Sequence, residues 1–249
     1  LGRFHTPFGL WNTSFHHGAN LQTSIFRPRF VDFEDKGGIL PVHTVGVWAS
    51  GKSRQGTGKI TYDLYLGNGP SIRQRHLDPN TFIDDDGGKM LGFNLGYEQA
   101  GVLGGWTLGI HGFGATVNAF TSTAALSNRT RLRAAGAYFG YDARDWEAIG
   151  EYYHFANADV ATGIRHSSNA WFAQLGRAFG SLTPFVRFER AALDPGDNYF
   201  RAQQTGSSYR RSVVGARYAL GMRSSIKLEL SSTSESPMVQ LDEGGLLVP

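Results

Sequence analysis

Hydrophobic and polar residues alternate along several segments of this chain. In residues 59–67, Ile60, Tyr62, Leu64 and Leu66 share one parity. The other parity holds Lys59, Thr61, Asp63 and Tyr65. The segments 91–98 and 225–231 repeat the pattern. Because successive side chains of a β-strand point to opposite faces, we predict strands with one apolar and one polar face.

Short and long connections separate these strands in strict alternation. Short ones fall at residues 51–58, 99–105, 142–145, 180–183 and 219–223, and long ones at 11–38, 67–88, 118–129, 156–168, 192–208 and 232–246. Short turns at one end and long loops at the other are typical of bacterial outer-membrane barrels. We therefore predict an all-β fold, a transmembrane antiparallel up-and-down β-barrel.

The expected strands occupy residues 1–10, 40–50, 58–67, 89–98, 105–117, 130–141, 146–155, 168–179, 182–191, 209–219 and 223–231. Single-chain bacterial barrels have an even number of strands, and residues 245–249 resemble the start of another. We therefore expect one domain, 1–249, incomplete at its C-terminus and at its N-terminus. The complete barrel would have at least ~12 strands, with about 14–16 expected.

Composition agrees with this fold. Charged residues make up 18% of the chain and the mean hydropathy is −0.28. No stretch approaches the ~18 apolar residues of a transmembrane helix. A soluble β-sandwich also alternates, but the order of its connections favours a barrel. The absence of cysteine excludes disulfides and thiolate chemistry, and the net charge of +3 is a weak sign of anionic partners.

Aromatic residues gather near the ends of the predicted strands. Rings with one polar edge are enriched at both membrane interfaces, so we predict aromatic girdles. The alternative is an ordinary aromatic core. The residues concerned are Trp11, Trp48, Trp106, Trp146, Phe155, Trp171, Phe179, Phe200 and Tyr218.

Two segments resemble a known family. Residues 2–10 read GRFHTPFGL and residues 146–153 read WEAIGEYY. Both are similar to segments of the phosphate-selective porins O and P and their relatives. The resemblance implies a Gram-negative outer-membrane channel, a trimer of barrels of about 16 strands, with a constriction loop folded inward. The chain is short for this family and has no dense arginine ladder, so the resemblance implies a porin and no particular solute.

Charged and amide side chains on the polar strand faces are the candidates for a pore lining. Rings of such groups set the ion preference of a channel, and a small positive excess predicts a mild preference for anions. The alternatives are that these groups solvate a wide channel or plug a narrow one. The predicted pore-lining residues are Lys59, Asp63, Asn94, Glu98, Gln174, Arg187, Glu189, Arg211, Arg217, Lys227 and Glu229.

The loop over residues 12–38 is long enough to be functional or disordered. Folded inward, it would narrow the pore, with Arg27 and Arg29 attracting anions. Folded outward, it would be an external cap.

We therefore expect a porin for passive diffusion of small hydrophilic solutes, with outer-membrane lipid and lipopolysaccharide around it. Its expected assembly is a homotrimer or a larger membrane complex, without nucleic acid or cofactor. A non-conducting barrel that binds protein is the main alternative.

Enzymatic and metal sites have less support in the sequence. His111, His154 and His166 lie in or beside strands without a nucleophile elbow, so we expect no enzyme. Residues 84–86, three aspartates, lack EF-hand spacing for calcium. The adjacent His16 and His17 lack a third metal ligand.

Overall fold

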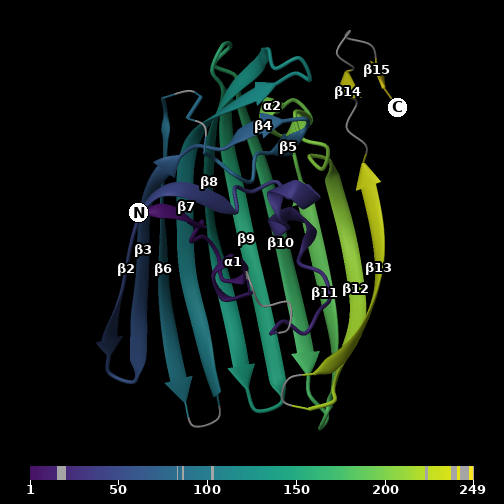
Figure 1. The fold of residues 1–249 in the computed structure, drawn as a ribbon. Helices are drawn as coiled ribbons and strands as arrows, with labels where there is room; N and C mark the ends of the chain where they lie inside the picture. The colour runs from purple at the N-terminus through teal and green to yellow at the C-terminus, as the bar shows by residue number, and fades with distance from the viewer. Residues whose placement is uncertain are drawn as a thin grey trace.

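Eleven antiparallel strands follow one another in chain order across one curved sheet in the computed structural model of this chain (Figure 1). The structure describes residues 1–15, 21–82, 84–85, 87–101, 104–221, 224–236, 240–241 and 247–248. The order in the sheet is β1-β2-β3-β6-β7-β8-β9-β10-β11-β12-β13, and two short strands, β4 and β5, bring it to 13 strands. The predicted all-β, antiparallel up-and-down architecture is confirmed.

The strands of the main path are β1 (Gly2–His5), β2 (His43–Gln55), β3 (Gly58–Asn68), β6 (Lys89–Gly101), β7 (Gly104–Phe120), β8 (Leu126–Ala143), β9 (Trp146–Asp159), β10 (Arg165–Arg177), β11 (Leu182–Ala192), β12 (Ser208–Ala219) and β13 (Ser225–Ser236). Off this path, β4 (Ser71–Arg73) pairs with β5 (His76–Leu77) and, in parallel, with the end of β7.

The described helices are short. They are α1 (Trp11–Phe15), α2 (Asn198–Arg201) and two 3-10 turns, η1 (Arg29–Val31) and η2 (Glu34–Lys36). Among the described residues, no helix has the length and hydrophobicity needed to cross a lipid bilayer.

The predicted tight turns lie together at one end of the sheet, the lower end of Figure 1. Two predicted long loops are wrong: residues 118–129 and 156–168 are mostly strand, and the connections that remain span 121–125 and 160–164. Polar residues at strand ends pair through their backbones like any others, so polarity there does not mark a loop. The first predicted strand, 1–10, is also too long, because only Gly2–His5 pairs with β2.

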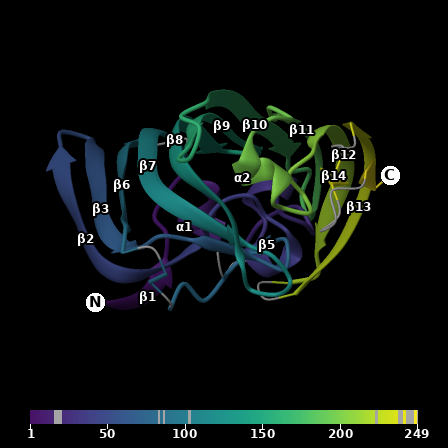
Figure 2. The ribbon, with the colours of Figure 1, turned by 90° about the horizontal axis from the view of Figure 1, so that it is seen from above.

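The sheet is curved into a trough and is not closed among the described residues (Figure 2). Its path ends at β1 on one side and β13 on the other. In the C-terminal region, where a further strand was expected, β15 (Leu247–Val248) pairs with β14 (Gln240–Leu241) in a separate two-stranded sheet.

The convex outer face carries the apolar parity of the strands. Leu64 is 56% exposed and Leu228 is 65% exposed. Of the eleven residues of this parity in segments 59–67, 91–98 and 225–231, nine are exposed, and Ile60 and Tyr97 are partly exposed. The exposed ones are Tyr62, Leu64, Leu66, Leu91, Phe93, Leu95, Ile226, Leu228 and Leu230.

The aromatic girdle is only partly as predicted. Trp11, Phe155 and Phe200 are buried inside the trough, so their assignment to a girdle is wrong. They belong to the core because the inner face of this sheet is covered by protein. At the tight-turn end, Trp146 and Phe179 are exposed, and the Arg177 guanidinium lies 4.9 Å from each ring centroid.

The core lies inside the trough, between the sheet and residues 6–15 and 21–42, which together we call the inner segment (Figure 2). Apolar residues of this segment pack against inward-facing residues of the strands. The segment contributes Phe8, Trp11, Phe30, Val31, Ile39, Leu40 and Val42; the strands contribute Tyr65, Met90, Phe113, Val117, Leu132, Tyr153, Phe155 and Phe172.

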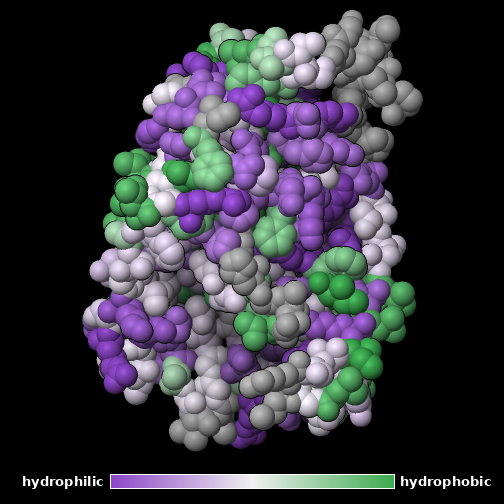
Figure 3. Space-filling view, in the orientation of Figure 1, coloured by the Kyte–Doolittle hydropathy of each residue, from purple (hydrophilic) through white to green (hydrophobic). Residues whose placement is uncertain are grey.

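The side of the molecule that faces the viewer in Figure 1 is mostly hydrophilic in its upper half (Figure 3). Hydrophobic residues show mainly at its left and right margins. The inner segment therefore lies between an apolar interface with the sheet and a front surface rich in polar residues.

We predict that Gly38→Ala destabilises the inner segment. A Cβ atom at Gly38 would overlap the Asp32 carbonyl group and approach the Phe33 carbonyl oxygen, so the turn that includes η2 would have to shift. Overpacking of this kind costs about 1–3 kcal/mol, measurable by chemical denaturation. Gly221→Ala is the matched control, because a Cβ atom there meets nothing within 4 Å. Equal stability of the two variants would contradict the close packing of this turn.

Candidate functional site

All the predicted pore-lining residues lie on the parity that faces into the trough. One group of them meets on β10 to β13 and contacts the inner segment, and the others lie separately on β3 and β6. The first group is Gln174, Arg187, Glu189, Arg211, Arg217, Lys227 and Glu229; the second is Lys59, Asp63, Asn94 and Glu98.

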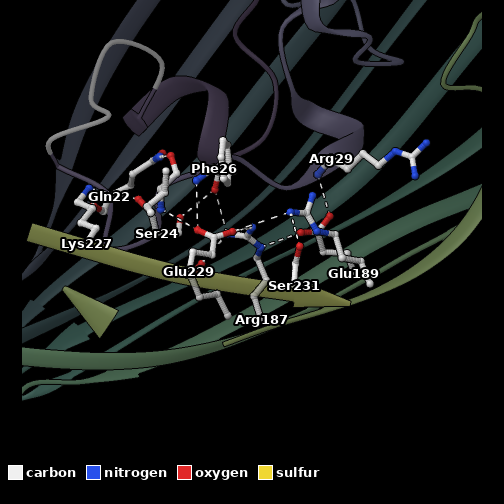
Figure 4. A network of polar contacts seen from close by, with 12 residues as sticks. Gln22, Ser24, Phe26, Arg29, Arg187, Glu189, Lys227, Glu229 and Ser231 are labelled. Carbon is white, nitrogen blue, oxygen red and sulfur yellow. Dashed lines mark hydrogen bonds and ion pairs between the residues drawn. The ribbon is translucent and has the colours of Figure 1, made fainter. Parts of the chain in front are cut away.

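Arg187 is the centre of the first group (Figure 4). Its side chain is fully buried, and it forms ion pairs with Glu189 at 2.8 Å and Glu229 at 3.2 Å. The remaining donors reach the Gln174 side-chain oxygen and the Phe26 carbonyl oxygen, each at 3.1 Å. A buried guanidinium is tolerated only when such partners satisfy it, so this cluster fixes three strands and the inner segment together.

Charged side chains of the wall bind the backbone of the inner segment. The second carboxylate oxygen of Glu229 accepts the Ile25 N–H at 2.7 Å and the Phe26 N–H at 3.2 Å. The Lys227 ammonium donates to the carbonyl oxygens of Gln22 and Ser24. These bonds give the irregular backbone of residues 22–26 the partners that a strand or helix would otherwise supply.

Glu189 extends these contacts toward η1. Its carboxylate accepts the Arg29 N–H at 2.7 Å, and the Arg29 guanidinium forms a bidentate pair with Glu235, both bonds at 2.8 Å. The Arg29 guanidinium also lies 4.7 Å from the Tyr209 ring centroid. Arg29, one of the two predicted constriction arginines, therefore joins the inner segment to β13.

Arg27, the other candidate, is only 7% exposed. It donates to the Asn12 side-chain oxygen at 3.0 Å and lies 4.4 Å from the Phe33 ring centroid. Burial lowers the pKa of Arg27 below its ordinary value, while the charges of Asp32 and Glu151 act in the opposite direction. Both arginines belong to the inward-folded segment, and their role toward a passing ion stays a prediction.

Glu151 holds the start of α1 and was not among the predicted site residues. Its carboxylate accepts the Leu10 N–H at 3.0 Å, the Trp11 N–H and the Tyr153 hydroxyl, the last at 2.6 Å. The first amides of a helix need such an acceptor. Its signal in the sequence is a carboxylate that lies between Ile149 and Tyr153 on a strand parity otherwise rich in large apolar residues.

The second group of predicted residues is more open at Lys59 and Glu98, whereas Asn94 is buried. Lys59 and Glu98 pair at 2.6 Å and keep 39% and 42% of their side chains exposed. Asp63 accepts from the Trp48 indole N–H at 2.9 Å, and Asn94 donates to the Gly9 carbonyl oxygen at 3.3 Å. The structure therefore does not join these residues to the Arg187 cluster.

A cavity of about 990 Å³ opens between α1 and the tight-turn end of the strands. Lys59, Glu98 and Gln174 line it, together with Trp11 and Glu147. Among the described residues, the buried Trp11 indole N–H and one Glu147 carboxylate oxygen have no hydrogen-bond partner.

The other end of the trough is covered by the connection between β11 and β12. The Tyr199 hydroxyl of α2 donates to the Ile39 carbonyl oxygen at 2.6 Å, and Asn157 donates to Asp197 at 2.8 Å. Asp197 also accepts the Tyr199 N–H, and burial raises the pKa of its carboxyl. This packing attaches the C-terminal part of the inner segment to a second connection.

Within the described ranges, no group of three His, Asp or Glu side chains is arranged for a metal ion. Asp84 pairs with Lys89 and Asp85 with Arg73, which neutralises two carboxylates of the candidate calcium loop. Asp86, His16 and His17 lie outside the described residues.

The histidines considered for catalysis are dispersed. His111 is buried against Tyr153, with ring centroids 4.5 Å apart. His166 pairs with Asp194 at 2.9 Å, a partner that sequence analysis did not identify. The Ser168 hydroxyl oxygen accepts the Asp194 N–H, and the described residues show no serine hydroxyl bonded to His166, which a nucleophilic triad would require.

Comparisons of the chain with protein-family models, with curated proteins and with solved structures found no match. The arguments about function therefore rest on the geometry of this molecule.

We predict that Arg187→Gln loosens the inner segment. The substitution leaves Glu189 buried without its cation and leaves Glu229 with only Arg211, 4.0 Å away. Breaking a buried ion pair from one side costs about 3–5 kcal/mol. Hydrogen exchange should show faster amide exchange over residues 22–30. Arg190→Gln is the control, since Arg190 lies on the same strand but faces outward and has no ion pair among the described residues. Unchanged exchange in Arg187→Gln would contradict the clamp.

Proposed function

We propose that this chain is an outer-membrane channel of the porin type, through which small hydrophilic solutes diffuse. The observation that carries the proposal is the reversed polarity of the sheet. Its convex face is covered by exposed Leu, Phe, Tyr and Val side chains. Its concave face carries charged and amide groups beside an aromatic core that the inner segment covers. A soluble β-protein hides its apolar face, whereas a membrane barrel turns that face to lipid.

The positions of the short and long connections support one orientation of the chain in the membrane. The tight turns lie at one end of the sheet (Figure 1), which in bacterial barrels is the periplasmic end. The connection that contains α2 and the one that contains β4 and β5 lie at the opposite end, which would be extracellular. The resemblance of residues 2–10 and 146–153 to porin segments favours the same function and a trimeric assembly.

The inner segment would narrow the passage. Its apolar side is buried against the wall, so solutes would pass along its polar front, toward the cavity at the tight-turn end. A mild anion preference would depend on Arg217 and Lys227. These residues are directly opposed on β12 and β13, whereas Arg187 and Arg29 are neutralised by carboxylates.

A non-conducting barrel that binds protein is the second candidate. Phe8, Trp11 and Phe30 fill part of the interior with a close-packed aromatic core, and the fully buried Arg187 cluster resists rearrangement. Both features suit a plugged barrel as well as a narrowed channel, so conductance decides between them.

The channel should conduct in discrete steps in a planar bilayer. A reagent attached to a residue of its inner wall should reduce the current. Because the chain has no cysteine, a single introduced thiol reports its own position. Ser231 faces inward on β13 and Leu230 faces outward. A charged, membrane-impermeant thiol reagent should reduce the conductance of Ser231→Cys and leave Leu230→Cys unchanged. A protein that inserts without current steps is the plugged scaffold.

Selectivity should be weak and dependent on salt. At ~0.01 M salt the screening length is about 30 Å, and at ~1 M it is about 3 Å. Reversal potentials across a KCl gradient should therefore favour chloride at low salt and lose that preference at high salt. Arg217→Gln should reduce the preference, while Arg144→Gln, in a tight turn, should retain it. Cation selectivity of the unaltered chain at low salt would refute the assignment.

The outer face should tolerate little charge at its centre. Leu64→Arg should lower the free energy of unfolding from a bilayer by about 2–4 kcal/mol if the site lies near the midplane. Lys52→Arg, on β2, is the control because it preserves an exposed charge near the tight-turn end. If Leu64→Arg had no effect on stability in lipid, the outer face would not be a membrane surface.

A further inference from the structure

The outer face of β11, β12 and β13 changes from apolar to basic within a few residues. Pairing places outward-facing residues of the three strands in successive cross-strand rows. From the tight-turn end, the rows are Leu182–Tyr218–Ile226, Pro184–Ala216–Leu228, Val186–Val214–Leu230, Phe188–Ser212–Ser232 and Arg190–Arg210–Ser234.

The last row brings two arginines directly opposite each other. Arg190 and Arg210 are register partners, and both are exposed. Like charges at directly opposed positions are destabilising. Neither guanidinium has a carboxylate partner among the described residues, whereas Arg187 and Arg29 on the inner side each have one. The described residues therefore provide no anion for this pair of arginines.

The surroundings of the pair form a shallow hollow. It has a volume of about 400 Å³ and is lined by Arg190, Arg210, Ser208, Ser234 and Ser236 among its residues. Two guanidinium groups and several hydroxyls are donors that match phosphate oxygens, and arginine binds phosphate in a bidentate manner.

The two arginines lie at the distance from the tight-turn end at which a lipid headgroup of the opposite leaflet is expected. Arg190 lies eight residues beyond Leu182 on β11 (190 minus 182), or about 26 Å along the strand at ~3.3 Å per residue. A strand tilt of ~40° reduces this to about 20 Å, comparable with the ~25 Å apolar band of outer-membrane barrels. The apolar rows below the arginines would contact acyl chains.

We propose that Arg190 and Arg210, with Ser234, form a binding site for the phosphate of a phosphorylated lipid headgroup in the leaflet on the side of the long connections. The proposal rests on the membrane location proposed above. A lipid fits better than free phosphate because the basic row lies one row, Phe188–Ser212–Ser232, from an apolar surface that would hold the acyl chains of the same molecule.

The test measures binding of diphosphorylated lipid A to the full chain in a neutral detergent by native mass spectrometry. Dephosphorylated lipid A and inorganic phosphate are the comparison ligands. The double variant Arg190→Gln/Arg210→Gln should bind lipid A about tenfold or more weakly, since two charge-assisted contacts are lost. The matched control, Lys52→Gln/Arg144→Gln, removes the same charge at the tight-turn end and should bind as the unaltered chain does.

The outcomes separate the two proposals. Equal lipid A affinity of the two double variants would overturn the site, even if the chain conducts in a planar bilayer. Binding of inorganic phosphate with the same affinity as lipid A would show an anion site without lipid specificity, and would also overturn it. A chain that neither inserts into bilayers nor binds lipid A would refute the membrane location and the site together, whereas a non-conducting chain that binds lipid A through these arginines retains the site.

Discussion

The structure depends on hydrogen-bond partners for a segment that has little regular secondary structure and lies inside a curved sheet. The described residues of the inner segment contain few helical turns, so many of their N–H and C=O groups need partners from elsewhere. The wall supplies them as charged side chains: Glu151 at the start of α1, Glu229 and Lys227 along residues 22–26, and Glu189 at Arg29. An apolar wall could bury the same rings but would leave these backbone groups unpaired.

The charges of the wall are compatible with burial because they neutralise one another. Arg187 joins Glu189 and Glu229, so two carboxylates that bind segment amides share one buried cation. A carboxylate that serves both a cation and a backbone amide is restricted to one geometry, which gives the segment one register on the wall. Such a network contributes more to specificity than to stability, because its desolvation offsets much of its attraction.

The period of two along the strands was sufficient to predict the sheet, since the parity of Leu64, Leu91 and Leu228 defines the exposed face in sequence and structure alike. It failed where the inner face is not polar. On β9, the large residues Tyr153 and Phe155 face inward beside Glu151 and are buried because the inner segment packs on them. No local sequence pattern predicts packing by a segment more than 100 residues away, and Leu10 and Glu151 are 141 residues apart. The same long-range packing explains why Trp11 and Phe200 are core residues, and why Arg27 and Arg29 were recognised as loop arginines but not as clamps.

The distribution of clamps also bears on where a solute could pass. Bonds between the inner segment and the wall are concentrated on β9 to β13, and they leave the Lys59–Glu98 pair on β3 and β6 partly exposed beside the cavity. The aromatic core closes the space behind the segment, so a path between segment and wall would require Phe8, Trp11 and Phe30 to leave their packing. A path in front of the segment would require no such change, because the upper half of that surface is mostly hydrophilic (Figure 3). The segment would therefore act as one wall of a channel and not as a gate within it, and the buried Arg187 cluster would determine the width of the passage by fixing the position of that wall.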